Sequence, residues 1–340
     1  MTRVKRATLT DVARLAGVSV TTASYILNGR TAQMRISDET AAKVRAAITE
    51  LDYRPNRSAQ NLRRASTQTV GVISDFVASG AFASQMLSGA SHAARALEHL
   101  LVIGETLGDP STEELMIREM LDRQVDGIVY LTVAASRVTV PPRLRTGPTV
   151  LLNCLDPELD LPAVLPDDEH GGRVAAAHLL QRGLGADVWA VGHDLDLGSP
   201  AGGDRLRGLA AGLAARGAAL SGVVSCEWDV RPAHDAVSAW LAEGNRPAVL
   251  VCLNDRIAMG VYQALAEFSL DVPHDVSVLS FDGSELADWM RPRLTSVALP
   301  FLAMGMLAVE HLLSPDSATA GVTRLPLAVE VGGSVLGDRQ

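Results

Sequence analysis

The sequence predicts a small all-helical head followed by a large α/β body built on parallel sheets. Three observations support this prediction. The first fifty residues hold three short stretches with helical apolar spacing and no strand pattern. From Thr69 onward, short apolar runs alternate with Ala- and Leu-rich helical stretches, as in parallel sheets. The length of 340 residues exceeds the roughly 100–200 residues of one domain, so more than one sheet is expected.

The charge of the chain is distributed unevenly. Residues 1–65 contain twelve Arg or Lys against five Asp or Glu, which is +7, and the remaining residues contain 18 basic and 34 acidic groups, which is −16. A basic head on an acidic body is typical of nucleic-acid binding, because the head neutralises phosphates. An ordinary solvated basic segment explains the charge equally well, so motifs must decide.

The head begins with a predicted helix-turn-helix. Thr10 is expected to cap a helix ending at Gly17, with Val12, Leu15 and Ala16 on its buried face. After this tight turn, Ser19 is expected to cap a second helix over 20–27, with Ala23, Ile26 and Leu27 inward and Asn28-Gly29 closing it. Two short helices joined by a Gly-containing turn form this motif.

The outward face of the second helix carries Val20, Thr21, Ser24 and Tyr25 and lacks the Glu and Lys that usually coat a solvated helix. Hydroxyl, phenol and apolar groups of this kind can contact base edges and thymine methyls in a major groove. Ser19 also presents a helix N-terminus suited to a phosphate. The alternative is that this face packs on the body of the protein.

A third helix is expected from Ser37, with Ala41, Val44, Ile48 and Leu51 inward. Residues 53–64 follow, in which Pro55 stops the helix and Asn56 could cap another short one. Such a helix is marginal by itself but could fold on DNA, with arginines on phosphates and Leu62 as an apolar wedge between base steps. The alternative is a plain basic linker.

The segments TLTDVARLAGVSVTTASYILNGR and ISDETAAKVRAAITELDYRPNRSAQNLRR resemble the DNA-binding head of the lactose- and galactose-repressor family of bacterial transcription regulators. The resemblance implies that Val20, Thr21 and Tyr25 read bases, although the family often has Arg at position 25. It implies that Leu62, paired with that of a second subunit, opens the minor groove. The full set of expected DNA-binding residues is Thr10, Ser19, Val20, Thr21, Thr22, Ser24, Tyr25, Asn28, Arg57, Ala59, Leu62 and Arg63.

The body is expected to contain about ten strands alternating with helices. Expected strands are 69–74, 100–104, 127–131, 149–152, 186–191, 222–225, 248–252 and 276–281. Expected helices are 82–98, 112–123, 170–182, 204–215, 232–243, 256–268 and 301–313. We interpret Asp167-Asp168-Glu169 as a capping cluster before one of these helices.

This body resembles the same family's regulatory core, which is similar to periplasmic sugar-binding proteins: two doubly wound lobes with a ligand between them. The resemblance divides the chain into a helix-turn-helix domain (1–54), a hinge helix and linker (55–68) and an effector-binding and dimerisation domain (69–340). Within the last, it implies a first lobe at about 69–167 plus 299–322 and a second at about 168–298 plus 323–340.

Candidate effector-binding residues stand where such folds bind ligands, outside the carboxyl ends of the strands. Arg205 matches the family arginine that hydrogen-bonds the effector, and Asp282 ends an apolar strand. Asn254 and Asp255 end another, although Asp255 could simply cap the helix from Arg256. The further candidates are Phe82, Asn153 and Trp228.

Two departures limit what the resemblance says about the effector. Val230 replaces a common cleft aromatic, for which Trp228 could substitute, and Leu299 occupies a position that is often polar in sugar-responsive members. A sugar or sugar derivative is expected, but the family also includes purine and nucleoside responders.

Motifs of several other classes are absent from the sequence. There is no phosphate-binding Gly-x-x-x-x-Gly-Lys-Ser/Thr loop, dinucleotide fingerprint or Gly-x-Ser-x-Gly elbow. Eight histidines and three distant cysteines show no metal-ligand spacing. No signal peptide or membrane-length apolar stretch is evident. We therefore expect a cytoplasmic protein without metal, cofactor or enzymatic activity.

The sequence thus predicts a homodimeric regulator, most often a repressor in this family, that binds a palindromic DNA operator under control of a small-molecule effector. A carbohydrate is the expected effector. Effector binding would change the angle between the lobes and hence the spacing of the paired hinge segments. Whether it releases or recruits DNA stays open. The competing interpretations are a sugar kinase with a DNA-binding head, which would need phosphate loops, and a solute-binding protein, which would need an export signal.

Overall fold

The computed structural model describes residues 7–53, 66–76, 83–158, 161–192, 200–314 and 321–337. The chain divides into two compact units, Met1–Thr67 and Gln68–Gln340. Several candidate residues lie outside the described residues, so their expected roles remain predictions. They are Arg57, Ala59, Leu62 and Arg63 of the expected hinge helix, and Phe82.

The first unit contains the three expected helices, α1 (Leu9–Ala16), α2 (Val20–Leu27) and α3 (Asp38–Glu50). All three contribute side chains to one small core. Its buried members are Val12, Ala13, Ala23, Ile26, Ala41, Val44 and Ala47. Leu15, expected on the buried face of α1, is instead 47% exposed, because Val12 and Ala13 fill the contact with the other helices. Leu27 is only partly buried.

The cap of helix α1 lies earlier in the chain than the sequence suggested. It is Thr8, and the expectation of Thr10 was wrong. Thr8 Oγ1 accepts a hydrogen bond from the Asp11 backbone N–H at 3.3 Å, and the Thr8 N–H donates to Asp11 Oδ2 at 3.0 Å. This reciprocal capping box outcompetes a cap at Thr10, which is an exposed residue inside the helix.

The other predicted caps of the head are confirmed. Ser19 Oγ accepts from the Thr22 N–H at 3.0 Å, and Ser37 Oγ accepts from the Thr40 N–H at 3.3 Å. Gly17 ends α1 with φ 69°, a left-handed conformation that glycine adopts without strain. The tight turn between α1 and α2 follows from this residue.

The described residues of the second unit form two six-stranded sheets. The first has the order β11-β5-β4-β3-β1-β2 and is parallel throughout. Its strands are β1 (Thr69–Ser74), β2 (Leu100–Glu105), β3 (Gly127–Arg137), β4 (Thr149–Leu155), β5 (Ala163–Pro166) and β11 (Val322–Leu325). We call this sheet and the helices that pack on it the first half of the unit, and the other sheet with its helices the second half.

The second sheet has the order β12-β10-β9-β8-β6-β7, with β12 antiparallel to β10 and the other pairs parallel. Its strands are β6 (Val188–Val191), β7 (Leu220–Val224), β8 (Val249–Cys252), β9 (Ser277–Asp282), β10 (Thr295–Ala298) and β12 (Ala328–Glu330). The described residues thus hold twelve strands rather than about ten, because β5, β10, β11 and β12 have only three or four residues each.

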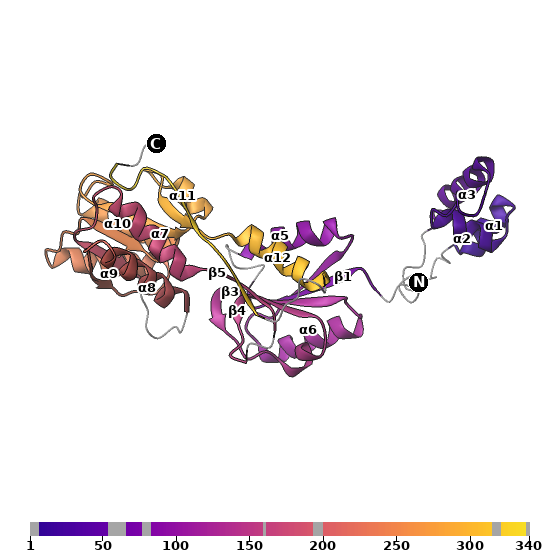
Figure 1. Ribbon diagram of the computed structural model, residues 1–340, viewed down its shortest axis with the longest axis horizontal. Coiled ribbons are helices and arrows are strands. Elements are labelled where there is room, and N and C mark those ends of the chain that lie inside the picture. Colours follow the sequence, from indigo (N-terminus) through magenta and orange to yellow (C-terminus); the bar gives the residue numbers. More distant parts are fainter. Residues whose placement is uncertain are drawn as a thin grey trace. The chain divides into compact units, whose positions relative to one another are not determined.

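The helices of the first half are α5 (Ala83–Ala96), α6 (Pro110–Asp122) and α12 (Phe301–Leu313), with a 3₁₀ turn, η1, at Pro142–Thr146. Figure 1 shows α5 and α12 on one side of the first sheet and α6 on the other. Val72 and its register partner Val129 pack on the α5/α12 side, whereas Ile73 and Leu151 pack with Ile117 of α6. The sheet is therefore buried on both faces, as parallel sheets are.

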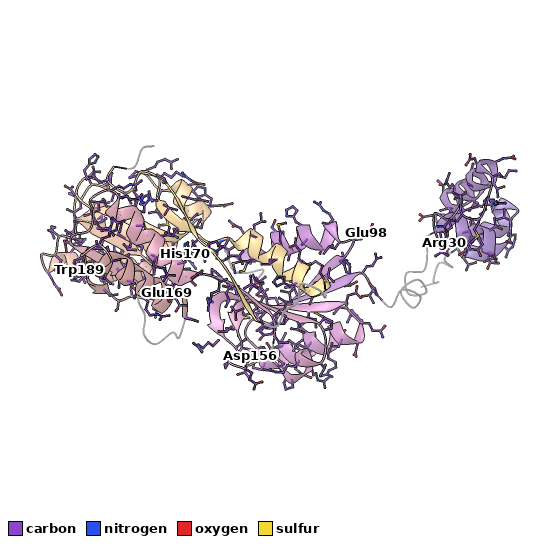
Figure 2. The ribbon with its side chains drawn as sticks, in the orientation of Figure 1. Arg30, Glu98, Asp156, Glu169, His170 and Trp189 are labelled. Carbon is purple, nitrogen blue, oxygen red and sulfur yellow. The ribbon has the colours of Figure 1, made fainter. Side chains whose placement is uncertain are left out.

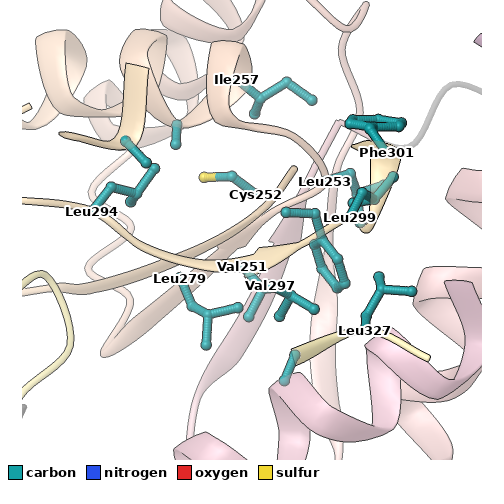
Figure 3. Close-up of a cluster of buried hydrophobic side chains, with 14 of the residues drawn as sticks. Val251, Cys252, Leu253, Ile257, Leu279, Leu294, Val297, Leu299, Phe301 and Leu327 are labelled. Atoms are coloured by element: carbon teal, nitrogen blue, oxygen red, sulfur yellow. The ribbon is translucent and has the colours of Figure 1, made fainter. Parts of the chain in front are cut away.

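In its described residues, the second half has four long helices and a short one. They are α7 (Asp168–Leu180), α8 (Pro200–Ala214), α9 (Val230–Ala242), α10 (Asp255–Glu267) and α11 (Glu285–Trp289). Figure 2 labels Glu169 and His170 at the start of α7, where the chain has just left the first sheet. One buried core, shared by both halves, extends from Leu279 and Val251 to Leu299 and Phe301, which lie beside Leu253 in Figure 3.

The chain passes between the two sheets three times, after β5, after β10 and after β11. The third passage lies between Leu325 and Ala328, not at the expected 322/323 boundary, because β11 continues its parallel pairing with β5 through Leu325. In the part of the chain that the structure describes, no helix is both long and apolar enough to cross a membrane.

Candidate functional site

A cavity of 350 Å³ lies at the carboxyl ends of strands from both sheets. One wall comes from the first sheet and the start of α12: Val133, Ala134, Ala135, Asn153, Pro166 and Phe301. The other comes from the second half: Asp168, Arg205, Trp228, Asn254, Arg256 and Asp282, with Ala201 and Gly202 beside them. Leu299, in the second passage between the sheets, also contacts the cavity. Parallel α/β folds bind ligands at this end of their strands.

Arg205 of α8 is a buried side chain of the cavity wall with several partners. It is 3% exposed, and its Nε donates to Asp168 Oδ1 at 2.8 Å. Its Nη1 donates to the Leu253 carbonyl oxygen and lies 3.5 Å from Asp282 Oδ1. The guanidinium also lies over the aromatic rings of Trp228 and Phe281, at 5.6 and 4.9 Å from their centroids. One buried cation therefore connects α7, α8 and the ends of β8 and β9.

A close approach of two helices brings Arg205 and Asp168 together. A Cβ atom on Gly172 of α7 would lie 2.2 Å from the Arg205 carbonyl oxygen, and one on Gly208 of α8 would lie 2.0 Å from the Glu169 carbonyl oxygen. Only glycine allows backbones to come this near. Asp168 precedes Gly172 by four residues and Arg205 precedes Gly208 by three, so each charged side chain shares a helix face with the glycine contact.

Burial dominates the electrostatics of the carboxylates here. It raises the pKa of Asp282 to about 8, and the attraction of Arg205 only partly offsets it. Burial also raises the pKa of Asp168, against the opposing effect of its ion pair with Arg205. For Arg205, burial lowers the pKa, but the attraction of the neighbouring Asp168 and Asp282 side chains raises it by more than burial lowers it. The pKa of Arg205 is therefore raised overall, and this side chain stays charged.

Two cavity residues on strands have backbones in the left-handed half of conformational space. Asn153, in β4, has φ 59°, and Asp282, at the end of β9, has φ 113°. Both Asn153 amide hydrogens are taken up by carbonyl oxygens, those of Thr132 and Val133, each at 3.0 Å. Residues held in sparsely populated conformations cluster at ligand sites, because there the fold overrides local preference.

Asn254 and Asp255 have different environments. Asn254 lines the cavity and caps α10, with its Oδ1 accepting from the Ile257 N–H at 2.7 Å. Asp255 is not the cap and does not contact the cavity. It accepts hydrogen bonds from the backbone and hydroxyl of Ser284, both at 2.7 Å, and from the Ser296 hydroxyl at 2.8 Å. Asp255 therefore fastens α10 to the loop after β9.

Sequence reasoning missed the role of Asp168. Asp167 does cap α7, accepting from the His170 N–H at 2.9 Å, but Asp168 pairs with Arg205 instead of capping. One signal in the sequence could have indicated this role. Asp168 follows another acidic residue, Asp167, which can serve as the cap, and it lies on the buried face of the helix. The sequence also did not predict the cavity wall that the first sheet forms, because Val133, Ala134 and Ala135 resemble ordinary strand residues.

The described head residues present the outward face of α2 to solvent. Val20 is 43% exposed, Thr21 is exposed, and Ser24 and Tyr25 are partly exposed. Ser19 and Thr22 are joined by capping hydrogen bonds, and the Asn28 side chain donates to the Ser24 carbonyl oxygen at 2.7 Å. Arg30, labelled in Figure 2, is exposed in the turn that follows α2. None of these residues is covered by the described core of the head.

Comparison with known proteins identifies two family models. Residues 8–56 match "Bacterial regulatory proteins, lacI family", and residues 176–335 match "Periplasmic binding protein-like domain". The ribose operon repressor of Escherichia coli (strain K12) is 30% identical over 90% of this chain and 92% of its own length. The transcriptional repressor PurR of Photobacterium profundum is 27% identical over 90% of this chain and 91% of its own.

Among solved structures, the lac repressor dimer bound to operator and the anti-inducer ONPF matches with a TM-score of 0.80. The two are 25% identical, and the match covers 98% of this chain and 100% of the other.

Proposed function

The chain belongs to the lacI family of bacterial regulatory proteins, a family of DNA-binding transcriptional regulators rather than enzymes, and we propose that it binds DNA through its head and an effector through its body. In this proposal it acts in the cytoplasm as a homodimeric repressor on a palindromic operator, without enzymatic activity, metal or cofactor. A small-molecule effector held in the 350 Å³ cavity controls its DNA affinity.

We propose that α2 is the recognition helix. Val20, Thr21 and Tyr25 reach base edges and thymine methyls, and Ser24 and Asn28 extend the same face. Ser19, Thr22 and Thr10 contact phosphates from the helix N-termini. The observation that carries this proposal is an outward face of hydroxyl, phenol and apolar groups on a segment with a net charge of +7. Arg57, Ala59, Leu62 and Arg63 are proposed to act in the minor groove, with Leu62 as the wedge.

In the body, we propose that Arg205 and Asp282 hold the polar groups of the effector. The effector also contacts Asn254, Asn153 and Trp228, which help to determine which ligands fit the cavity. Phe82 is proposed as a further contact. Asp255 supports the site indirectly, since its hydrogen bonds to Ser284 and Ser296 fix the loop beside Asp282. We propose that the body has two lobes. The first consists of residues 69–167 and 299–325, and the second of residues 168–298 and 326–340.

The proposed control has two states that differ in the angle between these lobes. An effector that contacts both cavity walls favours one angle, and it shifts the equilibrium only by its difference in affinity for the two states. The angle sets the separation of the paired segments 55–68, and therefore whether two heads can occupy successive major grooves.

Selection of duplexes from a random DNA pool by the full chain tests the proposal. A palindromic consensus should emerge, and Tyr25→Ala should weaken binding to it, whereas Glu50→Gln, an exposed change at the end of α3, should not. Sedimentation of the complex should give two chains per duplex. Recovery of no preferred sequence, with or without small molecules, would refute the proposed function.

A further inference from the structure

The point where segment 55–68 joins the body is held by two other parts of the chain. Thr69 is the first residue of β1, and its carbonyl oxygen accepts a hydrogen bond from the Asp126 N–H at 2.7 Å. The Thr69 N–H donates to Asp126 Oδ2 at 3.3 Å. Gln68, one residue earlier, has φ 51°, and its carbonyl oxygen accepts from the Leu100 N–H at 2.8 Å. A non-glycine residue keeps such a conformation only where its surroundings enforce it, so these contacts fix the direction in which the chain enters β1.

The Asp126 carboxylate is in turn held by His99, which lies between α5 and β2. His99 Nε2 lies 3.1 Å from Asp126 Oδ2, and the two side chains are 16% and 14% exposed. The other ring nitrogen, Nδ1, lies 2.6 Å from the Leu97 carbonyl oxygen. A carbonyl oxygen and a carboxylate can only accept hydrogen bonds, so both ring nitrogens must donate. Only the charged imidazolium has a proton on both nitrogens, and a neutral ring must give up one of the two contacts.

Other charged groups lie toward this edge of the first sheet, because α5 leads into β2, α6 leads into β3, and α12 ends with Leu312 beside Gly127 of β3. They are Arg95 and Glu98 around the end of α5, Asp122 and Arg123 at the end of α6, and Glu310 and His311 at the end of α12. All of them except His311 are exposed, so water weakens their effect on His99. Among the described residues, the carboxylate that forms an ion pair with His99 is that of Asp126.

We propose that His99 is a positioning residue for DNA binding: its charged form holds Asp126 against Thr69, and this makes operator affinity depend on pH. Histidine commonly changes charge between about pH 5 and 8. When His99 becomes neutral, the largely buried Asp126 carboxylate loses the cation that balances it, and the contacts that hold Thr69 weaken. The proposal rests on the proposed function, since it assumes that segment 55–68 transmits control from the body to the heads.

The effect on DNA follows from the pairing of the heads. Two heads bind one operator as a linked pair, so the affinity depends on the effective concentration of the second head once the first is bound. Added freedom at Gln68 and Thr69, where each linker is anchored, lowers this concentration. Operator affinity should therefore be highest while His99 is charged and should fall as pH rises.

The pH profile of operator binding tests this role. Fluorescence anisotropy gives the affinity of the full chain for the selected palindromic duplex, and for a random duplex, at constant ionic strength between about pH 6 and 8. His99→Gln keeps a group that can donate to Asp126 but cannot change charge. Over this range the parent should lose about fivefold more operator affinity than His99→Gln, a factor at the low end of the usual coupling between two binding events. On random DNA the two proteins should have the same profile.

His92→Gln is the matched control. It makes the same substitution at an exposed histidine of α5, which has no part in the contacts at Thr69, and its pH profile should be that of the parent.

A second variant and a measurement without DNA test the same contacts independently. Asp126→Asn keeps an oxygen that can accept from the Thr69 N–H but removes the charge that His99 balances, so it should also lose the pH-dependent part of operator affinity. Hydrogen exchange of the peptide spanning residues 66–74, corrected for the pH dependence of exchange itself, reports on the anchor directly. Its protection should fall from pH 6 to pH 8 in the parent and in His92→Gln, and stay constant in His99→Gln.

The outcomes separate the role of His99 from the function on which it rests. Parallel operator profiles for the parent and His99→Gln would overturn the role of His99 and leave the proposed function standing. An equal difference between the two proteins on random DNA would also overturn it, since the effect would then come from charge and not from the pairing of heads. If no operator were selected at any pH, the proposed function would fail, and unchanged protection of residues 66–74 in the parent would show separately that His99 does not hold the anchor.

Discussion

Arg205 Nε lies 2.8 Å from Asp168 Oδ1, and the two side chains are 3% and 5% exposed. This pair joins adjacent helices at the wall of the cavity, and Asp282 lies beside it at 3.5 Å. A charge so deeply buried is tolerated only while its partner is present. The pair is therefore both a structural link between α7 and α8 and a charged part of the cavity wall.

Removing one partner of this pair should be costly. Arg205→Ala and Asp168→Ala should each lower the free energy of unfolding by about 3–5 kcal/mol, because each leaves an uncompensated buried charge. The double variant should lose less than the sum. Arg207→Ala is the matched control two residues away, where an exposed pair with Asp204 contributes less than about 1 kcal/mol. Chemical denaturation measures all four, and additive losses would contradict the coupling.

The close contact between α7 and α8 should tolerate no side chain at Gly208. In Gly208→Ala, a Cβ atom would lie 2.0 Å from a backbone carbonyl oxygen, so the helices must separate and the Arg205–Asp168 pair must lengthen. We expect a loss of several kcal/mol, as for overpacked cores. Gly203→Ala in the same helix, where the nearest atom is a flexible arginine nitrogen at 3.4 Å, should be neutral or up to about 1 kcal/mol stabilising. Thermal unfolding that ranks the two variants equally would contradict the packing argument.

Stability should depend on pH through Asp282. Its pKa is raised by burial from 3.8 to about 8, so between these values the folded chain keeps a proton that the unfolded chain releases. Stability from this group therefore falls as pH rises through that window. Asp282→Asn removes the titration, and the unfolding free energy of the variant relative to the parent should increase from pH 5 to pH 8, by up to about 1 kcal/mol per pH unit.

The control for this measurement is Glu243→Gln, an exposed substitution just after α9, which should leave the pH profile unchanged. The opposite result would be a fall, from pH 5 to pH 8, in the unfolding free energy of Asp282→Asn relative to the parent. It would show that the ion pair with Arg205, and not burial, dominates the pKa of Asp282.

The start of α1 provides a comparison between two threonines. Thr8→Ala removes the cap and one half of the capping box, so the helix should lose about 1 kcal/mol of local stability. Thr10→Ala replaces an exposed residue inside the helix with a better helix former and should be neutral or stabilising. Hydrogen exchange of the amides of residues 9–16 in the full chain measures both. Faster exchange in Thr10→Ala than in Thr8→Ala would be inconsistent with the cap at Thr8.

Operator binding should have a strong electrostatic component. With several phosphates neutralised by the basic head, DNA affinity should fall steeply between about 50 and 200 mM salt. Leu62→Ala should weaken operator binding and leave effector affinity unchanged, because its proposed contact is with DNA alone. Fluorescence anisotropy at several salt concentrations measures both effects. Unchanged operator affinity in Leu62→Ala would count against the wedge.

The sequence predicted the parts of the fold that depend on local patterns. β1 and α12 have the expected bounds, since a six-residue run with an apolar centre and a thirteen-residue, largely apolar stretch at helical spacing are each unambiguous. The caps Ser19 and Ser37 and the left-handed Gly17 were equally local. The short strands β5, β10, β11 and β12 were missed, because three or four residues acquire strand character only from the neighbours with which they pair.

The cavity was less predictable for the same reason. Arg205, Asp282, Asn254, Asn153 and Trp228 were candidates, and the structure brings all five to one cavity. The sequence predicts a cap at Asp168, because only the packing of α7 on α8 shows that its side chain reaches Arg205. The sequence predicts a ligand or a cap at Asp255, because its partners Ser284 and Ser296 lie 29 and 41 residues further along the chain. Contacts of this range cannot be inferred from residue spacing.

The strand order has a consequence for synthesis of the chain. The first sheet receives its last strand, β11, at Val322–Leu325, and the second receives β12 at Ala328–Glu330. When the ribosome has translated residue 298, five strands of each sheet have been synthesised. Both sheets are completed only by the segment 322–330, which contains β11 and β12. A nonsense mutation or frameshift just before Val322 would therefore leave β5 and β10 as bare edges in both halves, and such edges recruit other chains. We expect truncated products of this kind to aggregate rather than persist as partly active repressors.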